Sequence, residues 1–572
     1  MKKQWRMRQP DVDAANKIRK YLKCNPIIAA ILVNRNITSP EDANRFLNPS
    51  LNNVRPPFSI KDMDAAVKRI YVAIMRREKI LIFGDYDVDG ITATTILLEF
   101  FQYIGTNVIY YIPHRSKEGY GLQVDHIFNV ASPNNVDLII TADCGSGSHD
   151  AVKAAVDAGM DIIVTDHHNV PDTLPPAKAV VNPKRPDCTA GFDNLAGVGV
   201  AYYLLVCLRK YLRDKNFWQS LPEPNLKRPC DLVALGTVAD MVPLVDENRI
   251  LTKSGMEVIS SGHRTGLNAL IELCGINSDS LDAHDIAYRL APRLNAAGRV
   301  AHAKTAVELL KTNNVKTAKH IAHSLNRMNI KRQEIERKIL DEIHIHFEKN
   351  PRLLKRHTIV LSDHTWNEGI LGIVASRIVD RYFRPVVLIS TKSGIGKGSA
   401  RSIPGIDLYE ALASCESSLE RFGGHSLAAG LSIKIENLDR FQKQFENAIL
   451  ESATPDDFVQ RISIDCELDF NDISPRLIDE IESLKPFGEG NPEPLFFARD
   501  IKVIFSKIVG KNHRRMTLRQ ASGKTRNTFN AIQFNIDPRL PLKESFDQIA
   551  FRLRWNFWNG EKAVQIVIEE TE

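Results

Sequence analysis

Short apolar stretches alternate with helix-like segments through the first half of the chain, and this alternation restricts the fold more than any other feature. The apolar stretches are KILIF before Asp85, NVIYYI at 107–112, VDLIIT before Asp143 and MDIIVT before Asp166. Helical patterns lie between them, for example HDAVKAAVDAGM at 149–160. Strands that alternate with helices build a parallel sheet covered by helices. The sequence therefore predicts an α/β domain with a parallel sheet.

The middle of the chain predicts a helical region and a second α/β unit. From about residue 285 the pattern is mainly helical, and a long charged stretch at 315–347 has apolar side chains at helical spacing: Leu325, Met328, Ile335 and Ile339. This stretch suits a helix that connects two domains, although an ordinary surface helix would show the same pattern. The second α/β unit is expected from HTIVLS at 357–362 to about residue 450.

The end of the chain predicts an all-β domain. After about residue 460 the pattern alternates with period two, and FRLRWNFW places apolar side chains at every second position from Phe551 to Phe557. Asn559-Gly560 predicts a hairpin turn, with KAVQIVIEE as the returning strand. We expect a small barrel of the OB-fold type.

Composition excludes several classes of protein. A chain of 572 residues is too long for one hydrophobic core, and 43% hydrophobic and 25% charged residues are ordinary for a globular protein. No apolar stretch approaches the roughly 18 residues that span a membrane. The start, MKKQWRMRQP, lacks the apolar core of a secretory signal, and the eight cysteines contain no C-x-x-C pair. We expect a cytoplasmic protein without a membrane segment.

The stretch LIFGDYDVDG, residues 81–90, places Asp85, Asp87 and Asp89 within five residues. An EF-hand loop also has aspartates at alternate positions, but it needs a glutamate at the twelfth position, where this chain has Ile96. An acidic turn exposed to solvent at the end of a strand is the ordinary alternative. Three like charges so close together favour a bound cation. The other acids of the chain decide between a cation site and an exposed acidic turn.

Further acids follow the other predicted strands. Asp143 lies in TADCGSG after one strand, Asp166-His167-His168 follow another, and Asp240 in GTVADMVPL comes where a helical segment ends. Because binding groups gather at the carboxyl ends of parallel strands, we expect these clusters to meet at one edge. Carboxylates and imidazoles without thiolates suit Mn²⁺ or Mg²⁺, as a pair that hydrolyses a phosphodiester. Any one of these acids alone would more often be a turn residue or a helix cap.

The motifs GDYDVDG, TADCG, TDHH and GTVADMVPL, in this order, resemble the DHH phosphoesterase superfamily. The resemblance continues through RLNAAGR at 293–299 and GGHSLAAG at 423–430, and FLNPSLNNVRPPFSIKDMDAAVKRI near the start fits it too, so it covers nearly the whole chain. Within the superfamily the chain is similar to bacterial single-strand-specific exonucleases. The implied domains are a DHH domain with an N-terminal extension (1–284), a helical connector (285–352), a DHHA1 domain (353–455) and an OB-fold-like nucleic-acid-binding domain (456–572).

The resemblance also implies roles for the acids and histidines. The implied ligands of two ions are Asp87, Asp89, Asp143, His167 and Asp240. Asp143 would bridge the two ions, and His168 would touch the substrate phosphate or help to activate the attacking water. Asp85 would be a ligand or a base close to the metals. Two segments depart from the family pattern: Phe83 stands where many relatives carry a possible histidine ligand, and SGSHD follows TADCG in place of a small apolar stretch.

Basic and glycine-rich segments are candidates for gripping a polyanion. Arg293, Asn295 and Arg299 of RLNAAGR could contact phosphate, although structural arginines are an equal alternative for Arg299. SARS and the Gly423-Gly424-His425 segment could cradle phosphates, or their glycines could only permit close packing. By resemblance, five residues of these segments bind the DNA backbone: Ser399, Arg401, Ser402, Gly424 and His425. Arg115 would hold the 5′ end.

The C-terminal region adds a basic run. Residues 507–526 contain seven Lys or Arg and no acid, which suits phosphate contact but also an exposed hairpin. Nearby aromatic side chains could stack on unpaired bases, and Trp558 is the candidate because it lies on the face opposite Phe557.

The resemblance implies a single-stranded-DNA-specific 5′→3′ exonuclease that releases mononucleotides in DNA recombination and repair. It also implies single-stranded DNA as substrate, with a helicase and a single-strand-binding protein as partners, and we expect a monomer. One alternative is a phosphodiesterase that acts on small nucleotides or short oligonucleotides, for which the basic C-terminal region would be unnecessary. Another is a non-catalytic DNA-binding scaffold, which would be expected to have lost metal ligands, whereas every acid is present here.

Overall fold

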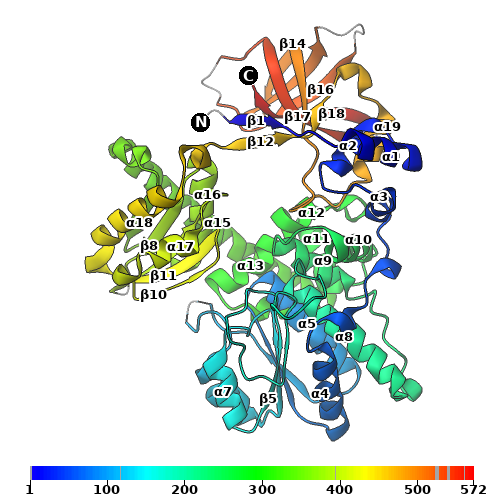
Figure 1. Ribbon diagram of the computed structural model, residues 1–572, viewed down its shortest axis with the longest axis vertical. Helices are drawn as coiled ribbons and strands as arrows, with labels where there is room; N and C mark the ends of the chain where they lie inside the picture. Colours follow the sequence, from blue (N-terminus) through cyan, green and yellow to red (C-terminus); the bar gives the residue numbers. More distant parts are fainter. Residues whose placement is uncertain (1–2, 116, 393, 522–526, 538–540, 559–560) are drawn as a thin grey trace. The chain divides into compact units, whose positions relative to one another are not determined.

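The computed structural model describes residues 3–115, 117–392, 394–521, 527–537, 541–558 and 561–572, and the side chains of residues 557, 558 and 561 lie outside this description. The chain forms two compact units (Figure 1). The first consists mainly of Pro56–Asp240 and Gly255–Gln460, and the second of Gln4–Arg55, Met241–Ser254 and Arg461–Glu572. None of the described helices is both long enough and apolar enough to cross a membrane.

The first unit contains the predicted parallel sheet. Its strands are β2 (Ile80–Gly84), β3 (Val108–Tyr111), β4 (Leu138–Ala142), β5 (Asp161–Thr165) and β6 (Ala179–Val181), in the order β3-β2-β4-β5-β6, with every neighbouring pair parallel. β2 and β4 are buried at every residue, as expected for strands covered on both faces. The strand order reverses between β2 and β4, and ligands bind at such a reversal in open α/β sheets.

Helices cover both faces of this sheet. They are α4 (Met63–Arg76), α5 (Val88–Tyr103), α6 (Val124–His126), α7 (His149–Asp157), α8 (Gly197–Asp214) and α9 (Cys230–Ala239). On one face, Leu81 and Ile139 share a core with Val152 and Ala155 of α7, while α4 lies on the other side of the sheet (Figure 1). α5 packs against β2, α8 and α9, so nearly all of its residues are buried.

The helical region predicted from about residue 285 begins earlier in the structure, at residue 246. It comprises α10 (Asp246–Ser260), α11 (Thr265–Leu273), α12 (Ala283–Asp285), α13 (Ala291–Val300), α14 (Lys304–Lys311) and α15 (Val315–Lys349). α15 is 35 residues long, and Leu325 and Ile339 are buried on its inner face, which confirms the long amphipathic helix. That face also buries Arg332 and Glu336, which pair with each other one turn apart.

The second sheet of the first unit is mixed. It has the order β10-β11-β9-β8-β7, from β7 (Ile359–Asp363), β8 (Val386–Ser390), β9 (Ile395–Arg401), β10 (Arg421–Gly424) and β11 (Ala428–Lys434). Only β7 and β8 are parallel. α17 (Leu408–Ala413) and α18 (Leu438–Ser452) share one core with the sheet, and α16 (Glu368–Tyr382) and the end of α15 share another.

The second unit contains a closed five-stranded barrel. Its strands are β14 (Phe496–Val509), β15 (His513–Gln520), β16 (Thr528–Gln533), β17 (Ser545–Trp558) and β18 (Glu561–Thr571). They pair in the order β14-β15-β16-β18-β17, and β17 returns to β14, so the barrel has no open edge among these strands. β17 and β18 form the predicted antiparallel pair, with Phe551 and Leu553 buried, while the predicted Asn559-Gly560 turn lies outside the described residues. This topology is that of an OB-fold.

The N-terminal residues pack onto the barrel. β1 (Gln4–Met7) pairs in parallel with β12 (Arg461–Ile464), and α1 (Val12–Leu22), α2 (Pro26–Val33) and α3 (Pro40–Leu47) share one core with α19 (Pro475–Glu482) and the barrel strands. β13 (Cys466–Glu467) joins the barrel sheet beside β14. The domain boundaries predicted from the sequence place residues 4–55 with the DHH domain, whereas in the structure they belong to the second unit. They pack differently because their apolar side chains, such as Ile28 and Leu32, are buried in the core of the second unit.

Candidate metal centre and adjoining cavity

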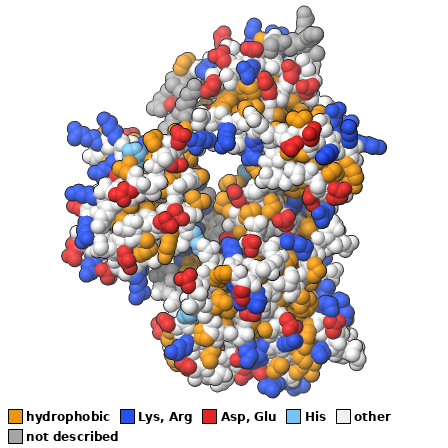
Figure 2. Space-filling model, viewed as in Figure 1, with side chains coloured by type: hydrophobic (Ala, Val, Ile, Leu, Met, Phe, Trp, Pro, Cys, Tyr) orange, Lys and Arg blue, Asp and Glu red, His pale blue; other side chains and the backbone are white. Residues whose placement is uncertain are grey.

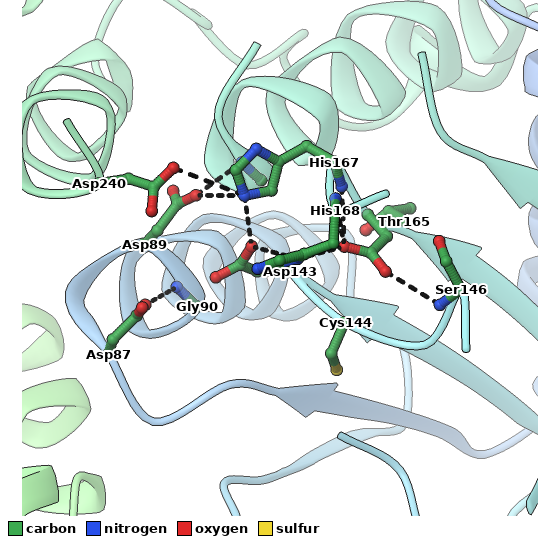
Figure 3. Close-up of polar contacts among 12 residues, drawn as sticks. Asp87, Asp89, Gly90, Asp143, Cys144, Ser146, Thr165, His167, His168 and Asp240 are labelled. Carbon is green, nitrogen blue, oxygen red and sulfur yellow. Dashed lines mark hydrogen bonds and ion pairs between the residues drawn. The ribbon is translucent and has the colours of Figure 1, made fainter. Parts of the chain in front are cut away.

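The acids that the sequence places after separate strands lie together in the structure (Figure 3). Asp85 follows β2, Asp143 follows β4, and His167 follows β5, while Asp87 caps the N-terminus of α5 and Asp240 caps the C-terminus of α9. Parallel strands deliver their carboxyl ends to one edge of the sheet, and the helix ends bring the remaining ligands to that edge. The predicted convergence is confirmed.

His167 lies at the centre of the cluster. Its Nε2 atom is 3.2 Å from Asp143 Oδ1, 3.5 Å from Asp240 Oδ2 and 3.8 Å from Asp89 Oδ2. These separations are those of ligand atoms that surround a shared cation.

The potential ligands fall into overlapping groups. One consists of Asp89, His167 and Asp240, and another of Asp85, Asp87 and Asp143; within each group the ligand atoms lie within 4.8 Å of one another. Asp143 also belongs to a third group, with His167 and His168. Two neighbouring groups with Asp143 between them match the geometry expected for two ions bridged by one carboxylate.

Several of these atoms make no hydrogen bond within the protein. Among the described residues, Asp85 Oδ1, Asp143 Oδ1 and His167 Nε2 are buried without a hydrogen bond. An unpaired buried carboxylate is costly, since burial removes the water that would stabilise its charge. Divalent cations coordinated by these oxygens and by the imidazole nitrogen would remove that cost, so the residues present fit the predicted metals.

The electrostatics of the cluster agree with this interpretation. Burial, assisted by the charges of neighbouring aspartates, raises the pKa values of Asp85, Asp143 and Asp240 well above the ordinary range, and burial together with Asp87 raises the pKa of Asp89 to about 7. Burial and the charge of His168 lower the pKa of His167 to about 3. His167 is therefore neutral at pH 7, the form in which imidazole binds a metal.

Asp89 is held by the start of α8. Its carboxylate accepts hydrogen bonds from the backbone N–H groups of Gly197 at 2.6 Å and Val198 at 2.9 Å. These N–H groups at the helix N-terminus carry partial positive charge, so they stabilise the carboxylate. Gly197 also permits the approach of Asp143, because a Cβ atom there would lie 2.4 Å from Asp143 Oδ1.

Asp166 fixes the turn that carries both histidines. It accepts hydrogen bonds from the backbone N–H groups of Ser146, His167 and His168, and its Oδ1 is 2.8 Å from His168 Nδ1. Burial lowers the pKa of His168, but the hydrogen bond and charge of Asp166 outweigh burial and raise that pKa to about 9. The hydroxyl of Tyr120 is 3.0 Å from the same Nδ1. His168 is therefore positively charged at pH 7 in the absence of metal.

Phe83 and the SGSHD segment, which depart from the family pattern, both have structural roles. Phe83 is fully buried and packs between Tyr111 and His126, so its side chain belongs to the sheet core. In the SGSHD segment, Ser146 donates its backbone N–H to Asp166, and His149 begins α7. The segment thus supports the histidine turn and lines a cavity beside the cluster.

A cavity of about 950 Å³ adjoins the cluster. Asp85, Asp87 and His168 line it on the side of the parallel sheet. Five predicted substrate residues line it as well: Arg115, Ser399, Arg401, Gly424 and His425. His425 lies close to the histidine turn, with its ring centroid 6.3 Å from that of His168 and its Nδ1 3.2 Å from Asn169 Nδ2. Carboxylates and cationic side chains therefore face one space.

The other predicted substrate residues contact protein groups outside the lining of this cavity. Arg293 donates to Asn326 Oδ1, Asn295 accepts from the backbone N–H of Val88, and Ser402 donates its hydroxyl to the carbonyl of Ile406. Arg299 donates to the carbonyl of Gly369, and burial together with the charge of Arg115 lowers its pKa to about 9. The side chain of Trp558 lies outside the described part of the structure.

The basic run forms part of the barrel surface. Lys507 on β14 lies opposite Arg515 on β15, and both are exposed, as is Lys511 between the two strands. Arg514 differs, because it is buried and donates to Ser506 Oγ and to the carbonyl of Lys543. Residues 522–526 of the run lie outside the description.

Some contributors to the site carry no recognisable sequence signal. The N–H groups of Gly197 and Val198 belong to an ordinary helix start, and Tyr120 and Asn169 lie in connecting segments. Asp166 stands next to the histidines in the sequence, but only the fold shows that it accepts four hydrogen bonds.

Known protein families and relatives match most of the chain. Family models match residues 79–237 (DHH family, N-terminal domain), 356–451 (DHHA1 domain) and 464–570 (RecJ OB domain). The single-stranded-DNA-specific exonuclease RecJ of Haemophilus influenzae is 35% identical over 96% of this chain and 96% of that protein. The chain belongs to the RecJ family. RecJ of Bacillus subtilis is 36% identical over 100% of the chain and 71% of its own length.

Solved structures of the RecJ family share the fold. RecJ from Thermus thermophilus in complex with Mn²⁺ is 30% identical and matches with a TM-score of 0.84, over 100% of this chain and 79% of that one. The complex with Mg²⁺ from the same organism matches with a TM-score of 0.77 at 29% identity. The predicted order of DHH, helical, DHHA1 and OB-type parts is thereby confirmed as a fold.

Proposed function

We propose that this RecJ-family chain is a metal-dependent, single-stranded-DNA-specific exonuclease that removes mononucleotides from the 5′ end in DNA recombination and repair. Its relatives are named single-stranded-DNA-specific exonucleases, and they match 96–100% of the chain. The observation that carries the proposal is the cluster of unpaired buried ligand atoms beside a cavity that also exposes Arg115 and Arg401.

We assign two divalent ions, Mn²⁺ or Mg²⁺, to the cluster. One would be held by Asp89, His167 and Asp240 and the other by Asp85 and Asp87, with Asp143 between them. The choice of metal is supported by the Mn²⁺ and Mg²⁺ complexes of the Thermus relative. Bound ions of this kind polarise a phosphoryl oxygen and lower the pKa of water. His168, held by Asp166, presents its ring to the same cavity, where it binds a substrate phosphate oxygen or orients the attacking water.

The side chains that line the cavity would bind the phosphates of the substrate. Arg115 and Arg401 supply positive charge and hydrogen-bond donors that match phosphate, and Ser399 and Gly424 line the same wall. We assign the 5′ end of the strand to Arg115, which also lies 4.8 Å from the ring centroid of Tyr86. The exposed basic residues of the barrel would attract the rest of the strand.

The proposal is tested with strands labelled at the 5′ or the 3′ end, single or paired, with and without Mn²⁺. We expect early release of the 5′ label as a mononucleotide, only from single strands and only with metal. Release of the 3′ label first would reject the polarity, and equal degradation of duplexes would reject the strand preference.

A phosphodiesterase for small nucleotides is the alternative, and the OB-type barrel argues against it, because a dinucleotide needs no second binding domain. Comparing the turnover of a long single strand with that of a dinucleotide separates the two, since a small-substrate enzyme would prefer the dinucleotide. We further propose that the chain acts in the cytoplasm as a monomer, beside a helicase and a single-strand-binding protein. Sedimentation and co-purification from the host test these assignments.

A further inference from the structure

Asn295 of the RLNAAGR segment faces the backbone that carries the metal ligands. It lies on α13, and its Oδ1 accepts a hydrogen bond of 3.1 Å from the backbone N–H of Val88. Val88 is the first residue of α5 and stands between Asp87 and Asp89. Because a backbone N–H can only donate, the side-chain oxygen of Asn295 must be the atom turned toward it.

This hydrogen bond caps the first N–H group of α5. The first N–H groups of a helix have no partner within the helix. Asp87 satisfies one of them by accepting from Gly90 at 3.1 Å, and Asn295 satisfies that of Val88. The two caps fix the turn from which the carboxylates of Asp87 and Asp89 project.

Gly298, one turn further along α13, brings the helix against the same loop. A Cβ atom at this position would lie 2.7 Å from the carbonyl oxygen of Tyr86, closer than side chains are found to backbone. The glycine therefore permits contact between α13 and the backbone of residues 86–88. Gly298 and Asn295 thus contact Tyr86 and Val88, which lie on either side of Asp87.

α13 is itself held in place from other directions. Arg293 donates to Asn326 Oδ1 on α15 at 3.0 Å, and Arg299 donates to the carbonyl of Gly369 on α16 at 3.1 Å. These contacts tie the helix that carries Asn295 to two other helices of the same unit. A support fixed in this way can hold a loop that bears three like charges.

We propose that Asn295 is a positioning residue that holds the Asp87–Asp89 loop in its metal-binding geometry, and that it does not contact DNA. The inference rests on the proposed function for the presence of metal, and it reassigns a residue expected from the sequence to bind phosphate. Groups that orient metal ligands typically change metal affinity by about 10–100-fold when they are removed. We expect Asn295→Ala to weaken Mn²⁺ binding within this range.

The experiment measures Mn²⁺ affinity by calorimetry in the absence of DNA, for the full chain and for Asn295→Ala and Asn295→Asp. The aspartate keeps an acceptor oxygen for the Val88 N–H, so Asn295→Asp should retain affinity close to the wild type. Asn313→Ala, an exposed asparagine before α15, is the matched control. Thermal unfolding shows whether each variant is folded.

DNA affinity measured in EDTA supplies the second readout. A positioning role predicts that Asn295→Ala binds a single strand as well as the wild type does. If instead both variants lose DNA affinity while Mn²⁺ binding stays unchanged, Asn295 contacts phosphate and the inference is overturned. Equal Mn²⁺ affinity in Asn295→Ala and the wild type overturns it as well.

These outcomes are distinguishable from failure of the proposed function. If the wild type binds Mn²⁺ but hydrolyses no single strand, the function is wrong, yet the loss of Mn²⁺ affinity in Asn295→Ala would still support the positioning role. If Asn295→Ala fails to fold, the inference stands or falls on Asn295→Asp. Retained Mn²⁺ and DNA affinity in this variant supports it, because a phosphate contact would not tolerate the added negative charge.

Discussion

At the scale of single residues, the site keeps acidic side chains close together by burying them before any metal is bound. Asp89 and Asp143 are each 1% exposed, and their raised pKa values show that the protein alone does not stabilise their charges. The protein stabilises part of this negative charge itself, because α8 donates two backbone N–H groups to Asp89. Divalent cations can supply the remainder, so activity should depend on Asp143, the carboxylate that lies between the two ligand groups.

Replacing that carboxylate tests the arrangement directly. We predict that Asp143→Ala lowers Mn²⁺-dependent hydrolysis of a single strand by about three orders of magnitude or more, because metal ions supply several kcal/mol of transition-state stabilisation. DNA binding should survive, since the cationic side chains are untouched. The measurement is single-turnover hydrolysis with a parallel binding assay. Asp157→Ala, which removes an exposed acid at the end of α7, is the control. Full activity in Asp143→Ala would remove the bridging role.

A glycine beside Asp143 offers an independent test. We predict that Gly197→Ala weakens Mn²⁺ binding by about 10–100-fold, since the new methyl group would lie 2.4 Å from Asp143 Oδ1 and displace it. Gly199→Ala on the same helix is the matched control, because its methyl group would meet only the flexible end of Leu195 at 3.1 Å. Calorimetry with Mn²⁺ measures both variants. Equal affinities for the two would show that Asp143 can shift without loss of the site.

The convergence of the acids could be predicted from the sequence, whereas the protein contacts of several cationic and polar residues could not. Aspartates after apolar strands are readable because strand ends of a parallel sheet must meet at one edge. Asn295 and Ser402 are not readable in this way, because a polar side chain in a glycine-rich motif can serve the backbone as well as a phosphate. Their hydrogen bonds to Val88 and Ile406 depend on packing between segments far apart in the chain or on a local turn.

At the scale of elements, periodicity predicted the parallel strands, the long helix and the barrel hairpin. It could not predict where α1, α2 and α3 would pack, because their apolar faces carry no information about their partner. In the structure they share a core with α19 and the barrel. Arg249, at the start of α10, belongs to the same unit and donates to the carbonyls of Phe46, Leu484 and Lys485.

Arg249 should therefore be important for the stability of the second unit. It is 2% exposed, and its guanidinium lies 3.7 Å from the centroid of the Phe46 ring. We predict that Arg249→Ala lowers the free energy of unfolding of this unit by about 3 kcal/mol or more, because buried carbonyls would lose charged donors. Hydrogen exchange of residues 483–486 and urea unfolding measure the effect.

Arg45→Ala is the control for that prediction. Arg45 is 66% exposed and pairs with Asp42 on α3, and exposed pairs contribute less than about 1 kcal/mol. If Arg249→Ala unfolds at the same urea concentration as Arg45→Ala, the buried contacts contribute little and the second unit is held by its apolar core alone.

At the scale of the whole molecule, charge is mild and widely distributed. The net charge is +6, and in Figure 2 Lys and Arg side chains are interspersed with Asp and Glu over the visible face. Lys507 and Arg515 are an exception to this mixing of charges, because two cations lie directly opposite each other on β14 and β15. Like charges at such positions in an antiparallel pair are destabilising. A protein that keeps such a pair exposed, with Lys511 nearby, is suited to bind a polyanion there.

The exposed cations Lys507, Lys511 and Arg515 of the barrel should contribute to the salt dependence of DNA binding. Removing three charges by Lys507→Ala, Lys511→Ala and Arg515→Ala should reduce the steepness with which single-strand affinity falls with salt. Each phosphate contact on a single strand contributes about 0.7 to the slope of log affinity against log salt, so the slope should decrease by about 2. Turnover of a dinucleotide should not change, since it needs only the cavity beside the metal ligands. The control removes three exposed lysines of the first unit that pair with acids, Lys68, Lys210 and Lys227. If the barrel variant and the control variant show the same slope of log affinity against log salt, the barrel residues act only through net charge. The strand would then be bound elsewhere.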